Sequence, residues 1–308
     1  FDSATLDKLL PIHNRLLADL RELGNEDDNA QKNEVIRKAQ EEIASEAVFK
    51  DEETKELAKQ AIELRYQLLP YNYTLAFQNS QTGIPLMRPL FFEEPDNPEL
   101  YQMAHTFLWG NDILVSMVSE PGIKEKEIYF PTGNNWIDFH TGKSYKGGTK
   151  SLVPLQEEYI PTFIRGGAFI PKAVLVQTTA NYDASTLDVH YYYDAEAKES
   201  SGILYHDDGL TPEAFEKGLY EIIGFKSTVE SGAINLVIDK EVGENAGSEI
   251  ELIRIHVENL KELVKYVWLN DIKYTGKNYM HLGKLDIPVH FYQDQPQNEV
   301  AYGQTPFP

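Results

Sequence analysis

The chain has 308 residues, 42% of them hydrophobic, and a formal net charge of −21 at pH 7. This apolar content is enough for two or three units with buried cores, so disorder is not expected. The negative charge disfavours nucleic acid and anionic membrane surfaces as partners, because both are polyanions, whereas a neutral sugar is not repelled. The absence of cysteine excludes disulfides, thiolate catalysis and cysteine-ligated metal sites.

The first residues contain no basic stretch followed by a long apolar run, and no window approaches about 18 uninterrupted apolar residues. We therefore expect neither a signal peptide nor a membrane span in this sequence. A leader removed before Phe1 would leave no trace, and cytoplasm and periplasm both stay open as locations. Because the sequence starts at Phe1 and not at methionine, we expect it to be a piece of a longer chain.

Residues 1–70 carry apolar side chains at helical spacing, which predicts three helices. Gly24 stands where a helix would end, and Pro11 kinks the first helix or marks its start. The acidic run Asp51–Glu56 predicts the first turn of a helix, where negative charge offsets the helix dipole. The apolar positions are Leu6, Leu9, Leu10, His13, Leu16, Leu17, Leu20, Val35, Ile36, Ala39, Ile43, Leu57, Ala61, Leu64 and Leu68.

After Tyr73 the pattern changes to short β-rich runs separated by turn signals that contain glycine. The runs form two sets, and the stretch Pro171–Ser185 between them is the predicted junction. The expected fold class is α+β: an N-terminal helical segment followed by two mainly antiparallel β-sandwich domains. We expect residues 100–170 and 186–308 to form these domains, with helix concentrated before residue 80.

Several segments resemble glycoside hydrolase family 31 in their order and spacing. They are Leu64–Leu75, Thr82–Phe91, Phe107–Val115, Glu120–Gly122, Tyr129–Pro131, Trp136–Gly142, Ile160–Pro171 and, more loosely, Leu204–Gly209. The resemblance covers roughly residues 58–308 and is strongest over 64–171. It implies that residues 58–98 are the closing helix and loop of a barrel, 99–175 a proximal β-domain and 176–308 a distal β-sandwich domain. Residues 1–57 form a helical segment that the family does not match.

The resemblance also implies that the catalytic residues lie elsewhere. In this family, the nucleophile is an Asp in a Trp-x-Asp-Met-like strand motif and the acid is an Asp on a later loop, both well before the matched helix. Neither motif occurs in residues 1–63. His13 lies on a helical pattern, so it does not receive the family's substrate-contacting histidine role. We assign no catalytic residue to this chain.

For the parent protein, the resemblance implies a retaining α-glycosidase, α-glucosidase-like, that hydrolyses terminal α-glycosidic bonds without metal or organic cofactor. The carbohydrate substrate would bind the missing barrel, and this chain alone is expected to be inactive. α-Glucoside, α-xyloside and α-galactoside all stay open as substrates. Two alternatives also stay open: a stand-alone carbohydrate-binding β-sandwich module, and docking of a partner or self-association through the leucine stripe of residues 1–57.

The most site-like cluster is Asp207-Asp208-Gly209, preceded by Tyr205 and His206. Asp-Gly between two β runs is also a strong hairpin signal, because glycine accepts the positive φ of the turn. We favour the turn, with a calcium site as the main rival.

The remaining candidates have structural interpretations. Gly147-Gly148-Thr149-Lys150 resembles a phosphate loop but lacks a following helix, so we predict a hairpin turn. Trp109, Trp136 and Trp268 lie in or beside apolar runs and are predicted to pack in cores, with stacking against sugar rings as the alternative. Arg88 is either a partly buried ion-pair anchor or a plain surface salt bridge. No histidine pair has metal-ligand spacing, and we assign no cofactor-binding or metal-binding residue.

Overall fold

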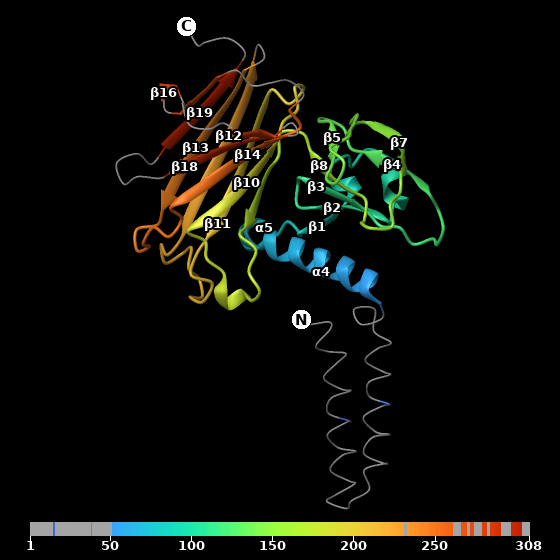
Figure 1. Cartoon of the computed structure of the whole chain (residues 1–308), viewed down its shortest axis with the longest axis horizontal. Helices are drawn as coiled ribbons and strands as arrows, with labels where there is room; N and C mark the ends of the chain where they lie inside the picture. The colour runs from blue at the N-terminus through green and yellow to red at the C-terminus, as the bar shows by residue number, and fades with distance from the viewer. Residues whose placement is uncertain are drawn as a thin grey trace, which may run out of the picture. The chain divides into compact units, whose positions relative to one another are not determined.

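The structure is a computed structural model of the whole chain (Figure 1). It describes residues 51–230 and 233–260, the single residues Arg15 and Lys38 before them, and the backbone of further strands after residue 260. The chain divides into two units, Phe1–Leu64 and Arg65–Pro308. The predicted leucine stripe before residue 51, His13 and the side chain of Trp268 lie outside the described residues.

Helix α4 (Glu52–Gln67) begins where the acidic run predicts a helix start. Asp51 caps it, because its Oδ1 atom accepts a hydrogen bond from the backbone N–H of Thr54 at 2.7 Å. Glu52 and Glu53 occupy the first turn, where they offset the helix dipole. The predicted N-terminal turn is confirmed.

Helix α5 (Leu69–Thr82) follows directly, with Pro70 in its first turn, where a missing N–H costs nothing. It ends at Gly83, whose φ of 74° suits glycine. The segment that resembles a single closing helix is thus divided between α4 and α5 at Leu68. None of the helices described here is long and apolar enough to cross a membrane.

The first β-region follows α5 and contains two sheets. Six strands form a sheet in the order β1-β2-β3-β8-β5-β6, and β4 pairs with β7, all in antiparallel fashion. The strands are β1 (Met87–Pro89), β2 (Thr106–Trp109), β3 (Ile113–Ser116), β4 (Glu125–Phe130), β5 (Trp136–Asp138), β6 (Ser144–Tyr145), β7 (Thr149–Pro154) and β8 (Thr162–Arg165), with 3-10 helices η1 (Leu90–Phe92) and η2 (Pro98–Gln102) between β1 and β2.

The second β-region is a sandwich of a five-stranded and a six-stranded sheet, with orders β17-β18-β14-β10-β9 and β11-β12-β13-β19-β15-β16. Its pairs are antiparallel except for β10 with β14. The elements are β9 (Phe169–Ala173), η3 (Thr179–Asn181), β10 (Thr186–Tyr192), β11 (Glu199–His206), β12 (Glu221–Glu230), β13 (Ala233–Val242), β14 (Leu252–Glu258), β15 (Tyr266–Leu269), β16 (Ile272–Lys273), β17 (Tyr279–His281), β18 (Lys284–His290) and β19 (Gln297–Gly303).

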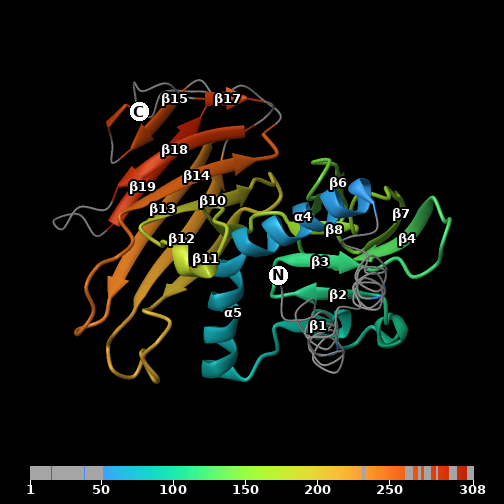
Figure 2. The ribbon, with the colours of Figure 1, turned by 60° about the horizontal axis from the view of Figure 1, so that its bottom comes forward.

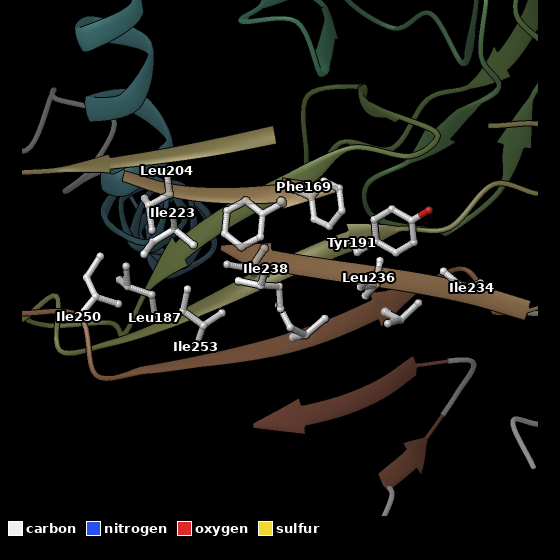
Figure 3. Close-up of a cluster of buried hydrophobic side chains, with 14 of the residues drawn as sticks. Phe169, Leu187, Tyr191, Leu204, Ile223, Ile234, Leu236, Ile238, Ile250 and Ile253 are labelled. Atoms are coloured by element: carbon white, nitrogen blue, oxygen red, sulfur yellow. The ribbon is translucent and has the colours of Figure 1, made fainter. Parts of the chain in front are cut away.

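The sandwich core follows from strand alternation. Leu187, Val189 and Tyr191 on β10 point inward and are buried, whereas the residues between them face outward. Figure 3 shows Leu187 and Tyr191 among side chains of the opposite sheet, such as Ile223 and Ile238. Burying this many aliphatic side chains is the main stabilising contribution here.

The expected α+β class, with helices followed by mainly antiparallel sheets, is confirmed. The domain boundaries stay a prediction. At the boundary expected near residue 175, β9 pairs with β10 and thus joins the sheet of the second β-region.

The hairpin predicted at Gly147-Gly148 is wrong. Gly148 does form a turn, with φ of 73°, and its N–H bonds to the carbonyl oxygen of Phe130 at 2.8 Å. However, the strand before the turn, β6, pairs with β5, and the strand after it, β7, pairs with β4. The turn therefore passes the chain from one sheet to the other, which local sequence does not reveal.

Candidate functional site

The predicted cluster around Asp207 lies where α5 contacts the second β-region, beside β11 (Figures 1 and 2). The Tyr73 hydroxyl of α5 donates to Asp207 Oδ1 at 2.5 Å, and the Tyr205 hydroxyl donates to Asp207 Oδ2 at 2.7 Å. The backbone N–H of Gly209 adds a third bond, to Oδ1, at 2.8 Å. Asp207 is therefore a clamp that joins the helix to the strand.

Two further contacts strengthen this junction. The backbone N–H of Tyr205 donates to the buried Thr74 hydroxyl at 3.0 Å, and that hydroxyl donates to the Pro70 carbonyl at 2.8 Å. The rings of Phe77 and Tyr205 stack with centroids 3.9 Å apart and planes 4° apart. α5 is thus fixed to β11 through backbone, hydroxyl and ring contacts at once.

The clamp keeps both phenols protonated. Burial, together with the hydrogen bond to Asp207 and its charge, raises the pKa of Tyr73 and that of Tyr205 well above the usual value for a phenol. Hydrogen bonds to both oxygens lower the nucleophilicity of the Asp207 carboxylate and hold it in the junction between helix and strand. This geometry argues against Asp207 as a nucleophile.

The next residues complete the loop after β11. Asp208 accepts bonds from the Thr211 hydroxyl at 2.6 Å and from the N–H groups of Thr211 and Leu210, and these bonds lower its pKa to about 2. His206 Nε2 lies 2.8 Å from Glu249 Oε2. Asp208 therefore stays ionised at any physiological pH.

The predicted turn is present, but not as a tight hairpin. Gly209 has φ of 64°, as the Asp-Gly signal requires. β11 and β12 do pair in antiparallel fashion, yet residues 207–220 separate them. Within the part of the chain that the structure describes, no group of three or more His, Asp or Glu side chains is arranged to hold a metal ion.

A pocket of about 470 Å³ opens beside the clamp. Its apolar wall includes Leu69, Pro70 and Leu187, and its polar rim carries several carboxylates. The lining residues are Leu69, Pro70, Tyr73, Thr179, Tyr182, Asp183, Ala184, Leu187, Leu204, Tyr205, His206, Asp207, Asp208, Gly209 and Glu249.

A buried ion pair supports the rim of this pocket. Lys240 Nζ and Glu221 Oε2 are 3.2 Å apart, with side chains 6% and 2% exposed. Lys240 also donates to the Ile250 carbonyl at 2.5 Å, and Glu221 accepts from the backbone N–H groups of Glu249 and Ile250. The pair thereby holds the segment that presents the Glu249 side chain.

The other side of α5 contacts the first β-region. The Tyr71 hydroxyl donates to the Trp109 carbonyl at 2.8 Å, and Trp109 Nε1 donates to Asn72 Oδ1 at 2.8 Å. A Cβ atom at Gly110 would lie 2.3 Å from the Tyr71 hydroxyl, and φ there is 69°. Only glycine fits this position of the segment Phe107–Val115.

Arg88 departs from both of its predicted roles. Its side chain is buried, and it donates to two neutral oxygens, the Pro85 carbonyl at 2.7 Å and Asn111 Oδ1. The neighbouring Asp112 has its pKa raised to about 6 by burial, against the opposing charges of Arg165 and Arg88. Arg88 therefore anchors the turn before β1 by hydrogen bonds to neutral groups.

Trp136 is fully buried, which confirms its predicted core role. Its Nε1 atom donates to the Pro131 carbonyl at 3.0 Å, and the Arg165 guanidinium lies 4.6 Å from its ring centroid. Trp109 is partly buried between α5 and the first β-region.

A second polar cluster lies on the outward face of β10 and β14. His190 and His256 stack with ring centroids 4.7 Å apart. His190 Nδ1 lies 2.7 Å from Glu258, while Asp188 accepts from His256 at 2.7 Å and from Arg254 at 2.7 and 2.8 Å. Burial lowers the pKa of His190 to about 4, although the Glu258 carboxylate opposes that shift.

The sequence interpretation missed several residues around the pocket. Tyr73, the pair Tyr182-Asp183 and Glu249 come from three separate segments, and only the fold gathers them. Of the lining residues, only the run from Tyr205 to Gly209 was considered as a site from the sequence.

Comparisons with known proteins agree with this architecture. Residues 83–170 match the profile described as the glycosyl hydrolase family 31 C-terminal domain. The chain is 33% identical over 239 residues to an alpha-xylosidase of Saccharolobus solfataricus. This match covers 78% of this chain and 30% of that protein. The chain is also 35% identical over 195 residues to alpha-glucosidase 2 of Bacillus thermoamyloliquefaciens. That match covers 63% of this chain and 23% of that protein.

The fold is also similar to solved structures. A dextranase of Flavobacterium johnsoniae, solved with glucose, has a TM-score of 0.74 at 22% identity and covers 84% of this chain and 34% of that one. The fold and the sequence are those of a C-terminal region of a glycosidase. The chain is a C-terminal region of glycoside hydrolase family 31, as the resemblance implied. It spans less than a third of the length of the two relatives named above.

Proposed function

We propose that this chain is the non-catalytic C-terminal part of a retaining, α-glucosidase-like enzyme that hydrolyses terminal α-glycosidic bonds. Its matches to proteins named alpha-xylosidase and alpha-glucosidase support the reaction class. The observation that carries the non-catalytic role is the clamp, in which the most site-like carboxylate, Asp207, accepts two phenol hydroxyls and a backbone N–H.

The hydrogen bonds on Asp207 matter because of what glycoside hydrolysis requires of a carboxylate. A retaining glycosidase needs one carboxylate free to attack the anomeric carbon and another, about 5 to 5.5 Å away, to protonate the leaving oxygen. Asp207 is committed to the clamp, and the bonds that lower the pKa of Asp208 to about 2 make it a poor proton donor at neutral pH. In this proposal, the parent's barrel supplies both groups, and this region braces the barrel.

The test compares the 308-residue chain with the full product of its gene on nitrophenyl α-glucoside, α-xyloside and α-galactoside. We expect hydrolysis by the full product and none above the blank by the chain. Turnover by the chain that survives repurification, vanishes in Asp207→Asn or Asp208→Asn, and persists in the exposed loop control Asp96→Asn would overturn the proposal. An intact mass of the gene product no greater than 35.1 kDa would also contradict it.

Self-association through residues 1–57 stays a separate prediction. Size-exclusion chromatography with light scattering on the chain tests it, because a dimer that becomes monomeric when residues 1–50 are removed would support docking through the leucine stripe.

A further inference from the structure

The pocket beside the clamp has the size and composition of a small-ligand site. Its volume of about 470 Å³ falls within the range of roughly 300 to 1,000 Å³ typical of ligand pockets. Such sites combine apolar walls with a few placed polar groups. Here Leu69, Pro70, Leu187 and Leu204 provide the apolar wall, and the polar groups are mainly acceptors.

The acceptors are fixed before any ligand arrives. Asp183 accepts from the N–H and the hydroxyl of Ser185 at 2.8 and 2.9 Å, which also lowers its pKa. Asp208 is held in the same way by Thr211 and Leu210. Each carboxylate oxygen can accept about two hydrogen bonds, so both groups keep capacity for a ligand. Acceptors that are already oriented lower the entropy cost of binding.

Tyrosine rings complete the lining. Tyr73, on α5, is 40% exposed, and Tyr182 is partly buried against the sandwich core. Burial raises the pKa of Tyr182 to about 12, so it stays a neutral phenol. Aromatic rings present flat apolar surfaces with a polar edge, a form that suits a ligand with both C–H and O–H groups.

The carboxylates that line the pocket come from separate segments of the chain, which bears on the class of ligand. Asp183, Asp208 and Glu249 belong to three separate segments, and within the described residues no three acidic or histidine side chains converge as a metal ion would require. Dispersed acceptors suit a ligand with several separated donors. A neutral sugar has hydroxyl donors around its rim and C–H groups on its faces.

We propose that this pocket binds a neutral saccharide, whose hydroxyls donate to Asp183, Asp208 and Glu249 and whose C–H face packs on Tyr182 and the apolar wall. The site rests on the chemistry of the pocket and not on the hydrolytic role proposed for the parent. The ion pair of Glu221 with Lys240 positions the segment that carries Glu249.

The experiment measures binding of maltotriose to the 308-residue chain by titration calorimetry and by saturation-transfer NMR. We expect millimolar or tighter affinity, roughly fivefold weaker binding in Glu249→Gln and in Asp208→Asn, and at least about tenfold weaker binding in Tyr182→Ala. The controls are Tyr101→Ala and Asp96→Asn, exposed residues of the first β-region that should leave affinity unchanged. If Tyr182→Ala unfolds, Glu249→Gln still decides, because the Glu249 side chain is 61% exposed.

Three results would overturn the proposal: no maltotriose binding, binding that is indifferent to all three pocket variants, or choline binding more tightly than maltotriose at the same pocket. Hydrolysis by the full gene product is measured separately. Loss of maltotriose binding with intact hydrolysis refutes only this proposal, and binding without hydrolysis refutes only the proposed function.

Discussion

The two β-regions bury different kinds of side chain. In the first, strands are short and the core is rich in rings: Phe130, Tyr145 and Phe163 contact one another, with centroids 4.8 to 5.5 Å apart. Leu90 and Leu100, from 3-10 helices outside the sheets, fill the remaining space. In the second, long strands contribute mainly aliphatic side chains from two facing sheets.

The amino-acid sequence therefore specifies the two cores in different ways. Aliphatic side chains on regular strands need only the right volume and alternation, and such cores tolerate conservative exchange. Interlocked rings need particular shapes and angles, and their polar edges need partners. The segments that resemble the family most strongly lie in the first β-region, where Trp136 and Phe163 are core residues, so much of the family's sequence signature there is structural.

The largest expected effect tests this contrast directly. Trp136→Ala should lower the free energy of unfolding by about 4 kcal/mol, because it opens a cavity and removes both the indole hydrogen bond and the packing of Arg165. Ile238→Val, in the second core, should cost only about 1 kcal/mol. Urea unfolding followed by circular dichroism gives both values. Equal losses would mean that the two cores do not differ in the way proposed.

Next in size is the buried ion pair of the second β-region. Lys240→Met should cost about 3 kcal/mol, because it leaves the Glu221 carboxylate buried without its cation. Adding Glu221→Gln should recover much of that loss, since the neutral amide tolerates burial better. The double-mutant cycle is read by urea unfolding, and purely additive losses would argue against a coupled pair.

A pH titration tests the polar outer face of the second β-region. Burial lowers the pKa of His190 to about 4 in the folded state, from an ordinary value of 6.5. The unfolded chain therefore binds the proton first, and stability should fall as pH drops from about 6.5 to 4, by on the order of 2 kcal/mol. His190→Gln should flatten this part of the stability profile. An unchanged slope in the variant would assign the loss to other groups.

The smallest expected effect concerns backbone strain in the loop after β11. Gly209→Ala should cost about 1 kcal/mol, because φ is 64° although the surrounding space is open. Gly247→Ala is the matched control, since that glycine is also in open space but has no positive φ, and it should be nearly neutral. Thermal melts suffice for the comparison. A Gly209→Ala variant as stable as the control would show that the loop rearranges.

Local patterns predicted what depends on neighbours along the chain. The acidic run at Asp51 predicted the first turn of a helix, and the β-rich runs after Tyr73 predicted mainly antiparallel strands. The same patterns could not predict which strands pair, because the exchange of sheets at Gly148 depends on contacts that are distant in sequence.

The candidate site likewise contains residues that local sequence singled out and residues that only the fold brings to it. The run from Tyr205 to Gly209 stood out because it combines acidic, aromatic and glycine residues in a short stretch. Its structural role depends on Tyr73, which lies 134 residues earlier, and no local pattern links the two. The ion pair of Glu221 with Lys240 joins the adjacent strands β12 and β13. Nothing in the sequence near either residue predicts that its charged side chain is buried.

The contacts of α5 also determine the order in which parts of the chain can fold during synthesis on the ribosome. Tyr73 and Asp207 are 134 residues apart, and Thr74 and Tyr205 are 131 apart. At typical synthesis rates, α5 emerges on the order of 10 s before β11 does. Its contact with Trp109 can form early, whereas Thr74 and Phe77 must wait for the sandwich. A nascent chain that stalls in this interval would present a helix docked on one side only, a substrate for chaperones until the second β-region arrives.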